Sequence, residues 1–234
     1  MKKLSLALLS WVFILSSCSK DGDLVQDPTF KSKYLSGVVT TNSGVSNTMN
    51  MTYTPDGKLS SIIENNGATT FSHNSSGNLT SISSQGDVLD IQELYNGPQE
   101  GYEIGRVLSY NAEGNPSKLE IFEDGPGSDV AIADILYDPN PNPYFKTMEA
   151  AGIIDVLNNV EVSFNTSNSN ILQARLLLPT NNIKTIIAKD FDGRTVYEMQ
   201  ATYVYDADSY PISANITEIV DGDVTTTQVT YSYR

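Results

Sequence analysis

The sequence is poor in the side chains on which many catalytic and metal sites depend. Its 234 residues include one cysteine, one histidine and one tryptophan, and 14 Lys and Arg stand against 28 Asp and Glu. One cysteine allows neither an internal disulfide nor a cysteine-based zinc site, so the core must form without covalent staples. A net charge of −14 argues against nucleic acid and anionic membrane surfaces as partners, because both select clustered basic residues.

Catalytic motifs are also scarce. The single histidine, His73, would have to serve any Ser-His-Asp or histidine-metal site alone. It also occupies a position of the repeat described below, which gives it a structural role. The chain contains no Gly-x-Ser-x-Gly elbow, Walker loop, dinucleotide fingerprint or His-Glu-x-x-His motif. The sequence therefore favours a protein that is not an enzyme, with carboxylate chemistry left open as the alternative.

The amino terminus has the organisation of a bacterial lipoprotein signal. Two lysines precede a mostly apolar run over residues 4–15, which is shorter than the ~20 residues of a membrane-spanning helix. Leu15-Ser16-Ser17-Cys18 resembles the lipobox at which bacterial lipoproteins are cleaved and acylated. The resemblance implies that residues 1–17 are removed and that Cys18 carries several acyl chains, which together give a stable anchor.

The residues that follow Cys18 predict where in the cell the lipoprotein is located. Ser19, rather than Asp, comes next, which by similarity to lipoprotein sorting rules implies the outer membrane. Residues 20–23, Lys-Asp-Gly-Asp, resemble the short tag that gut Gram-negative anaerobes use to export lipoproteins to the cell surface. We expect residues 18–33 to form a flexible polar tether and residues 34–234 to form a single β-rich domain.

The rest of the chain has a pattern typical of short strands and tight turns. Runs rich in Val, Ile, Thr and Tyr alternate with clusters of Asn, Asp, Gly and Ser. One unit recurs, in which a Tyr is followed by a turn cluster with Gly and then by Leu or Pro. Its copies centre on Tyr53, His73, Tyr110, Tyr137 and Tyr205, with a degenerate copy around residues 162–168. Because Gly tolerates positive φ and Asx side chains bond the nearby backbone, each copy predicts a β-hairpin.

One segment departs from this pattern. Residues 147–157 carry apolar residues at helical spacing, follow the proline-rich run 139–143, and begin with Thr147 as a predicted N-cap. We therefore predict one short α-helix near 147–158. The predicted fold class is all-β, a mainly antiparallel β-hairpin meander that forms an open curved sheet or a partial barrel.

The turn signal also resembles a known repeat. Residues 74–82, Asn-Ser-Ser-Gly-Asn-Leu-Thr-Ser-Ile, are similar to the YD (RHS-type) repeat. Residues 137–143, 178–183 and 203–233 together resemble a family of surface lipoproteins of gut Gram-negative anaerobes that is built on such hairpins. The resemblance covers residues 45–234 and implies a hairpin-built sheet. It implies no activity, because the function of that family is unknown.

Three groups of side chains are candidates for a functional site. Four tyrosines outside the repeat are candidates for ligand binding, namely Tyr95, Tyr102, Tyr144 and Tyr197. Turn aspartates place hard oxygen ligands close together and are weak calcium candidates, namely Asp206, Asp208, Asp221, Asp223 and the run 124–129. Glutamates in or beside strands would supply the carboxylate pair of a glycan hydrolase, namely Glu64, Glu93, Glu103, Glu120 and Glu123. Ordinary turn and sheet-surface roles account for the acidic residues equally well.

Together these features favour a lipid-anchored β-protein of the outer membrane, exposed at the cell surface. We expect a non-catalytic binding or structural module, in glycan or nutrient capture, whose membrane partner is the bilayer through Cys18. A glycan or an outer-membrane protein is the expected further partner, and no cofactor beyond calcium is indicated. Two alternatives stay open, a carboxylate-based glycan hydrolase and an assembly partner of an outer-membrane transporter that docks by strand addition.

Overall fold

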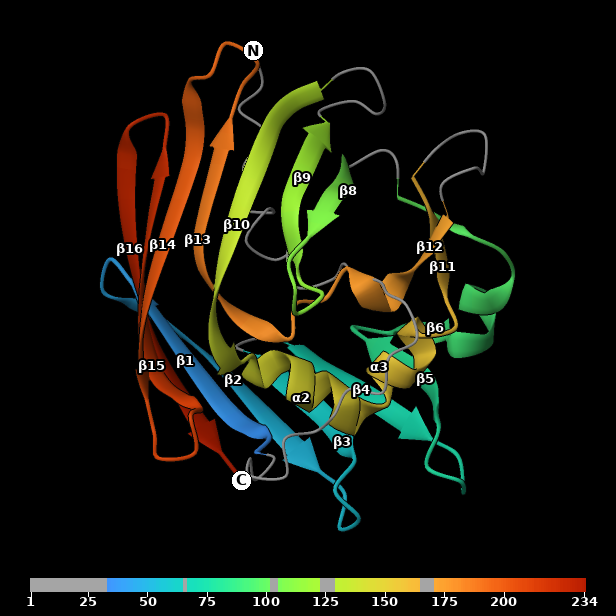
Figure 1. Ribbon diagram of the computed structural model, residues 1–234. Helices are drawn as coiled ribbons and strands as arrows, with labels where there is room; N and C mark the ends of the chain where they lie inside the picture. The colour runs from blue at the N-terminus through green and yellow to red at the C-terminus, as the bar shows by residue number, and fades with distance from the viewer. Residues whose placement is uncertain (1–32, 65–66, 102–104, 123–128, 165–170) are drawn as a thin grey trace.

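A large antiparallel sheet dominates the computed structural model, which describes residues 33–64, 67–101, 105–122, 129–164 and 171–234 (Figure 1). Thirteen strands lie in the order β6-β5-β4-β3-β2-β1-β16-β15-β14-β13-β10-β9-β8. The strands are β1 (Leu35–Asn42), β2 (Val45–Tyr53), β3 (Leu59–Glu64), β4 (Gly67–His73), β5 (Leu79–Ser84), β6 (Asp87–Asp90), β8 (Gly105–Tyr110), β9 (Pro116–Phe122), β10 (Asp129–Pro141), β13 (Asn181–Lys189), β14 (Thr195–Tyr205), β15 (Pro211–Val220) and β16 (Asp223–Tyr233). All neighbouring pairs are antiparallel, which confirms the predicted fold class.

Two meanders meet at the centre of this sheet. Strands β1 to β6 form one meander, strands β8 to β10 and β13 to β16 form the other, and the pairing of β1 with β16 joins them. A small sheet of β7 (Gln99–Glu100), β11 (Glu161–Ser163) and β12 (Ile171–Gln173) lies at one side. Because β6 and β8 end the order of the large sheet, the sheet is open rather than closed into a barrel.

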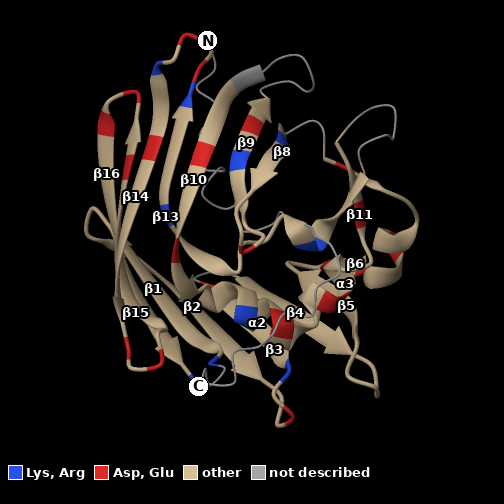
Figure 2. Cartoon of the chain, viewed as in Figure 1, with Lys and Arg blue, Asp and Glu red and all other residues tan. Residues whose placement is uncertain are grey.

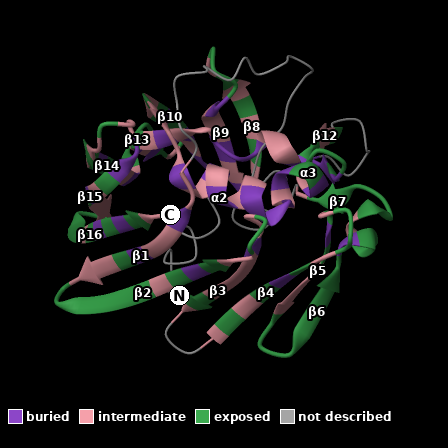
Figure 3. Ribbon diagram, turned by 90° about the horizontal axis from the view of Figure 1, so that it is seen from below, coloured by how far each residue is buried: buried purple, intermediate pink, exposed green. Residues whose placement is uncertain are grey.

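The helices lie inside the curve of the large sheet. Figure 3, seen from below, shows α2 (Pro143–Ala151) and α3 (Ile153–Leu157) enclosed by the sheet, with the buried residues gathered toward them. Two single-turn 3₁₀ helices, η2 (Ile91–Tyr95) and η3 (Ala174–Leu176), complete the described helical structure. The main core forms where the apolar side of α2 and α3 meets the concave face of β1 to β5.

The helical segment starts earlier than predicted and consists of two helices rather than one. Asn142, not Thr147, caps α2, and its side chain accepts a hydrogen bond from the Tyr144 N–H at 3.0 Å. The proline-rich run does not exclude the helix, because Pro143 occupies the first helical position, where a missing N–H costs nothing. Thr147 instead donates to the Pro143 carbonyl at 2.9 Å and accepts from the Leu35 N–H at 3.1 Å, which ties α2 to β1.

The hairpin prediction is confirmed at four copies of the repeat. In each, the first turn residue donates its N–H to the carbonyl four residues later at 2.8–2.9 Å. The side chain of that first residue binds the backbone as well; Asn111, for example, accepts from the N–H groups of Glu113 and Asn115. These turns span residues 54–58, 74–78, 111–115 and 206–210. The predicted turn therefore forms at each of these four copies, where a Tyr or His is followed by a five-residue turn and then by the antiparallel partner strand.

The prediction is wrong at Tyr137, where β10 continues to Pro141 and leads into α2 without a hairpin. Asp138 there accepts from the Asn140 N–H at 2.8 Å, a local turn within the strand end rather than a chain reversal. Residues 190–194 form the same five-residue turn without a preceding Tyr, so the Tyr-based search missed it. For the degenerate copy, β11 pairs antiparallel with β12, and residues 165–170 between them lie outside the described residues.

Tyrosines of the large sheet stabilise it through their hydroxyl groups. Four of them, two at repeat centres and two on later strands, donate to a backbone carbonyl 18 to 22 residues away in the sequence. The donor and acceptor pairs are Tyr53 with Leu35, Tyr137 with Pro116, Tyr203 with Ile183, and Tyr233 with Pro211. His73 plays a similar part, since its Nε2 lies 2.9 Å from the Ala151 carbonyl. The ring of each tyrosine fills the interior while its hydroxyl satisfies a backbone acceptor.

Candidate functional site

A cavity of about 760 Å³ lies on the concave face of the sheet, bounded by β1, β2, β13 to β16, α2 and the segment 178–182. We call this cavity the groove. Successive residues of a strand point to opposite faces, so every second residue of each wall strand lines it. On β15 these residues are Ile216, Glu218 and Val220. A volume of this size falls in the ~300–1,000 Å³ range of small-molecule sites.

The lining of the groove is mainly aliphatic and aromatic. It includes four tyrosines and an apolar set made up of Val38, Val45, Met49, Met148, Leu178, Pro179, Ile183, Ile186, Met199, Ile216, Val220 and Val229. Threonines and asparagines of β1, β2 and β16 add polar groups along one side, and Asn142 and Asn182 add them near α2. The Asn182 amide donates to the Pro141 carbonyl at 3.0 Å, so this side chain holds the end of β10 in place. The groove thus combines an apolar wall with a polar side formed by threonines and asparagines.

Two tyrosines in the groove lie beside carboxylates. The Tyr197 hydroxyl donates to Glu218 Oε1 at 2.8 Å. Burial raises the pKa of Tyr197 above its ordinary value, and the hydrogen bond to Glu218 raises the pKa further. Burial likewise raises the pKa of Tyr144, and the charge of Glu64 adds to this effect. Both phenols therefore stay protonated across the physiological range and act as hydrogen-bond donors.

The charge in the groove has one sign. Glu64 and Glu218 line it, and none of the described lining residues is Lys, Arg or His. Within the described part of the chain, neither carboxylate takes part in an ion pair. Figure 2 shows Asp and Glu near the ends of β14 to β16, with Lys or Arg beside them at the upper ends of β13 and β14. The charged side chains that line the groove itself are negative.

The two groove carboxylates are far apart along the sheet. Glu64 ends β3 and Glu218 lies on β15, and β2, β1 and β16 separate these strands. Four strand spacings of ~4.8 Å place them roughly 19 Å apart along the sheet. A glycosidase needs two carboxyl groups on either side of one bond, within about 10 Å of each other. At this separation along the sheet, Glu64 and Glu218 do not form the carboxylate pair of the hydrolase alternative.

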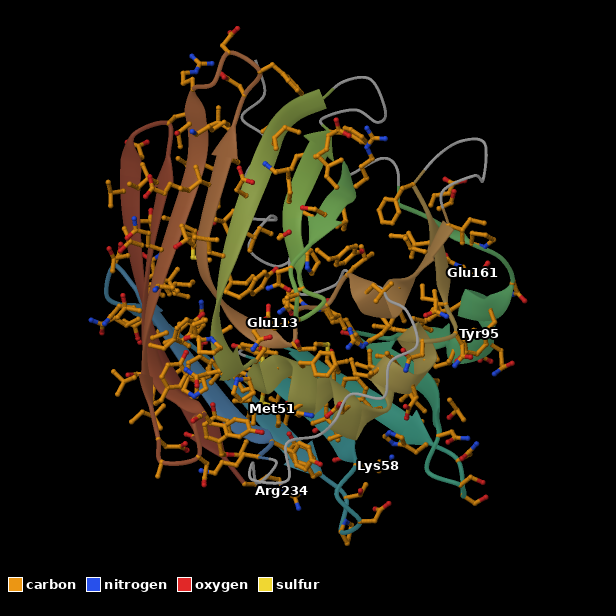
Figure 4. All side chains as sticks on the ribbon, viewed as in Figure 1. Met51, Lys58, Tyr95, Glu113, Glu161 and Arg234 are labelled. Carbon is orange, nitrogen blue, oxygen red and sulfur yellow. The ribbon has the colours of Figure 1, made fainter. Side chains whose placement is uncertain are left out.

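The structure brings two of the four candidate tyrosines to the groove. Tyr144 from α2 and Tyr197 from β14 both line it. Tyr95 lies exposed on η2, and Figure 4 places it beside the small sheet, away from β14. Tyr102 lies outside the described residues. Ligand binding by Tyr144 and Tyr197 stays a prediction, now attached to a defined cavity.

The candidate calcium ligands have other contacts. Lys33 Nζ lies 2.6 Å from an oxygen of Asp206 and 2.5 Å from an oxygen of Asp208. Asp221 occupies the two-residue turn between β15 and β16 with φ +51°, and Asp223 begins β16. Among the residues that the structure describes, no group of three or more His, Cys, Asp or Glu side chains is arranged to hold a metal ion. The remaining run, 124–128, lies outside the described residues.

The candidate glutamates are scattered. Glu120 is buried and forms an ion pair with Arg106 of the neighbouring strand, which accounts for it structurally. Glu93 is exposed on η2, whereas Glu103 and Glu123 lie outside the described residues. Of the five, Glu64 is the one that reaches the groove.

The sequence reasoning missed the wall formed by β13 to β16. One signal could have found it, because the alternating residues Ala214, Ile216, Glu218 and Val220 place a glutamate on the apolar face of a strand. A carboxylate in that position is costly unless it has a partner or a task.

Comparisons with known proteins give distant matches of fold. No protein-family model matches the chain, and no curated protein matches its sequence. A porin-like protein from Bacteroides vulgatus matches with a TM-score of 0.39 and 11% identity, over 86% of this chain and 99% of that one. A porin-like protein from Bacteroides uniformis gives 0.37 and 12%, over 86% and 98%. An outer membrane lipoprotein-sorting protein domain from Vibrio parahaemolyticus, described as putative, gives 0.27 and 11%, over 89% and 87%. Similarities this low carry no inference about function.

One further structural finding concerns the membrane. Among the described residues, no helix combines the length and the apolar character needed to span a bilayer.

Proposed function

We propose that this chain is a lipid-anchored, non-catalytic binding protein of the bacterial outer membrane that takes an elongated apolar ligand into the groove. The observation that carries the proposal is the apolar groove of about 760 Å³ between the concave face of the sheet and α2. The proposal sharpens the binding module expected from the sequence, because it names the surface that binds. It replaces a glycan with an alkyl chain as the expected ligand.

The lining supports an alkyl chain over a sugar. Sugars are held by many hydrogen bonds and by stacking on exposed aromatic rings, whereas the groove presents aliphatic side chains of β13 to β16. Burying one methylene group of a ligand contributes ~0.8 kcal/mol, which is about a fourfold gain in affinity. Ten buried methylenes contribute ~8 kcal/mol before the cost of association and ordering is subtracted, so we expect a decyl chain to bind more weakly than micromolar.

The lipid anchor is proposed from the sequence. The Leu15-Ser16-Ser17-Cys18 signal would place acyl chains on Cys18, and the polar residues after it would hold the domain away from the bilayer. The resemblance to YD-repeat surface lipoproteins supports exposure on the cell surface. Loss of radiolabelled palmitate from the Cys18→Ser chain in cells would support acylation, and removal of the protein by protease added to intact cells would support surface exposure. Retention of the label, or full protection from protease, would refute the respective statement.

The binding proposal is tested with n-alkanols of increasing length. The full chain carrying Cys18→Ser lacks the acylated thiol and can be handled without detergent, which would compete for the groove. Titration calorimetry with octanol, nonanol and decanol should show about fourfold tighter binding per added methylene. Affinity that does not change with chain length, or no binding at all, would refute a groove for alkyl chains.

Two neighbouring residues of β15 supply matched variants. Ile216 lines the groove, whereas Asn215 points from the opposite, exposed face. Ile216→Trp should obstruct the groove along β15 and weaken alkanol binding, and Asn215→Trp should bind as the parent chain does. Equal loss in both variants would mean that the alkanol acts on folding rather than on the groove.

A further inference from the structure

The groove also carries charge. The carboxylates of Glu64 and Glu218 line it, and no basic side chain is among the described lining residues. Glu218 is half-buried on the groove face of β15, with Met199 of β14 and Thr225 of β16 as its register partners on the neighbouring strands. Glu64 lies on the opposite wall, at the end of β3.

A carboxylate in apolar surroundings is costly to keep ionised, and a nearby cation offsets that cost. The Tyr197 hydroxyl supplies one hydrogen bond to Glu218 Oε1. A carboxylate has a second oxygen and further acceptor sites, and these can receive a donor from a bound molecule. Tyrosine rings in the lining add negative ring faces that attract cations.

A bound anion would meet the opposite conditions. The carboxylate of a fatty acid would bring like charge toward Glu218 and Glu64 in a space with low polarity, where repulsion is strong. A neutral alcohol would meet neither attraction nor repulsion beyond a hydrogen bond. The charge of the groove thus separates three head groups that share one alkyl chain.

We propose that the groove selects cationic amphiphiles, meaning an alkyl chain that carries a protonated amine, with the amine at Glu218 and the chain along Ile183, Ile186 and Met199. This inference rests on the proposed function, because it assumes that alkyl chains enter the groove. It adds the class of head group, which neither the anchor nor the fold determines.

The test compares three ligands of one chain length on the full chain with Cys18→Ser, at pH 7, low salt and concentrations below micelle formation. Decylamine should bind about tenfold more tightly than decanol, and decanoate should bind more weakly than decanol. Equal affinities for the three would overturn this inference and leave the proposed function standing. Absence of binding by all three would overturn the proposed function itself.

Matched variants separate the groove from the general acidity of the chain. Glu218→Gln should abolish the preference for decylamine over decanol, measured as the ratio of the two affinities within the same variant. Glu198→Gln on β14 removes the same charge from outside the groove and should retain the preference. A preference that survives Glu218→Gln, or that falls equally in Glu198→Gln, would contradict recognition by Glu218. Unchanged melting of each variant confirms that the comparison is made on folded protein.

Discussion

The two halves of the large sheet use the same strand chemistry but differ in what covers their concave faces. In the first half, β1 to β5, the side chains meet α2 and α3 and form the main core, which includes Leu35, Leu59 and Phe71. In the second half, β8 to β10 and β13 to β15, the described cluster consists of sheet residues alone, such as Ala133, Ile186 and Met199. The groove runs over β13 to β16 and onto β1 and β2, and α2 borders it on one side. We call the first half the covered half and the second half the open half.

The difference shows how one pattern can serve both stability and function. Alternating apolar residues in the covered half gain their free energy by packing against helices, at close to crystal density. The same alternation in the open half leaves a cavity lined by apolar groups. Its lining residues Ile186, Tyr197 and Met199 are at most 9% exposed, so this apolar surface faces the cavity rather than bulk solvent. The covered half therefore carries stability, and the open half carries the proposed binding function.

Core truncation should give the largest difference between the halves. Leu59 of the covered half is 1% exposed, and Leu59→Ala should lower the free energy of unfolding by about 2–5 kcal/mol, because a cavity remains. Ile216 already borders the groove, so Ile216→Ala should cost less, about 1 kcal/mol. Urea denaturation of the two variants measures both values. Equal losses would mean that the open half is packed as tightly as the covered half.

Glycine substitution should give the next largest difference. Gly152 separates α2 from α3 at φ +77°, and an added Cβ would lie 3.3 Å from Leu79 Cβ of β5. Gly193 in the turn between β13 and β14 has φ +80° with no atom within 4 Å of that position. Gly193→Ala should cost about 1 kcal/mol for its backbone conformation, and Gly152→Ala should cost more because of the added contact. Identical melting temperatures for the two variants would contradict close packing under the helices.

Turn substitutions should affect the halves equally. Asn74 in the covered half and Asn111 in the open half each accept two backbone N–H groups of the same five-residue turn. Replacing either with Ala should cost about 1 kcal/mol, because the lost bonds are partly replaced by water. Denaturant midpoints give the comparison. A much larger loss at Asn74 would show that packing, rather than turn chemistry, decides the stability of these hairpins.

The smallest expected effect concerns acid stability where the meanders meet. Burial alone would raise the pKa of Asp206, but hydrogen bonds from Lys33 and from the N–H groups of Tyr210 and Asp208 outweigh it and hold the pKa below its ordinary value. A lowered folded-state pKa contributes stability above the unfolded pKa of about 4, and that stability is lost as the pH falls through the folded value. Asp206→Asn should therefore flatten the decline in melting temperature below about pH 4.

Lys33→Gln provides the complementary variant, because it removes the cation and leaves the turn carboxylate in place. It should also reduce the acid-dependent part of the stability, by less than Asp206→Asn does. If the melting temperature of both variants falls as steeply below about pH 4 as that of the parent chain does, the contact between Lys33 and Asp206 contributes nothing to acid stability.

Much of the fold could be predicted from the sequence, since turn chemistry is local. An Asn, Asp or Thr followed three residues later by Gly, or by Ser209 in the last turn, favours a hairpin whatever the distant residues do, and four turns were predicted on that basis. The prediction failed at Tyr137, because Pro139, Pro141 and Pro143 suit a strand end followed by a helix as well as they suit a turn. The helix start was misplaced for the same reason.

The candidate site was harder to predict, because it depends on which strands become neighbours. The pairing of β1 with β16 joins chain segments almost 200 residues apart, and local patterns contain no signal for it. Tyr144 and Tyr197 were selected because they fall outside the repeat, and the fold brings both to one cavity. Glu218 was missed, although a glutamate on the apolar face of a strand is a local signal that sequence reasoning can use.

Photolabelling tests the central claim of the account most directly. A decyl alcohol with a diazirine near the end of its chain is bound to the full chain with Cys18→Ser, activated by light, and mapped by peptide mass spectrometry. The account predicts labels on groove residues of β13 to β15, such as Ile186, Met199 and Ile216, and their loss in Ile216→Trp. Labels on the outer face of the same strands, at Asn215 and its neighbours, or labels unaffected by Ile216→Trp, would contradict it.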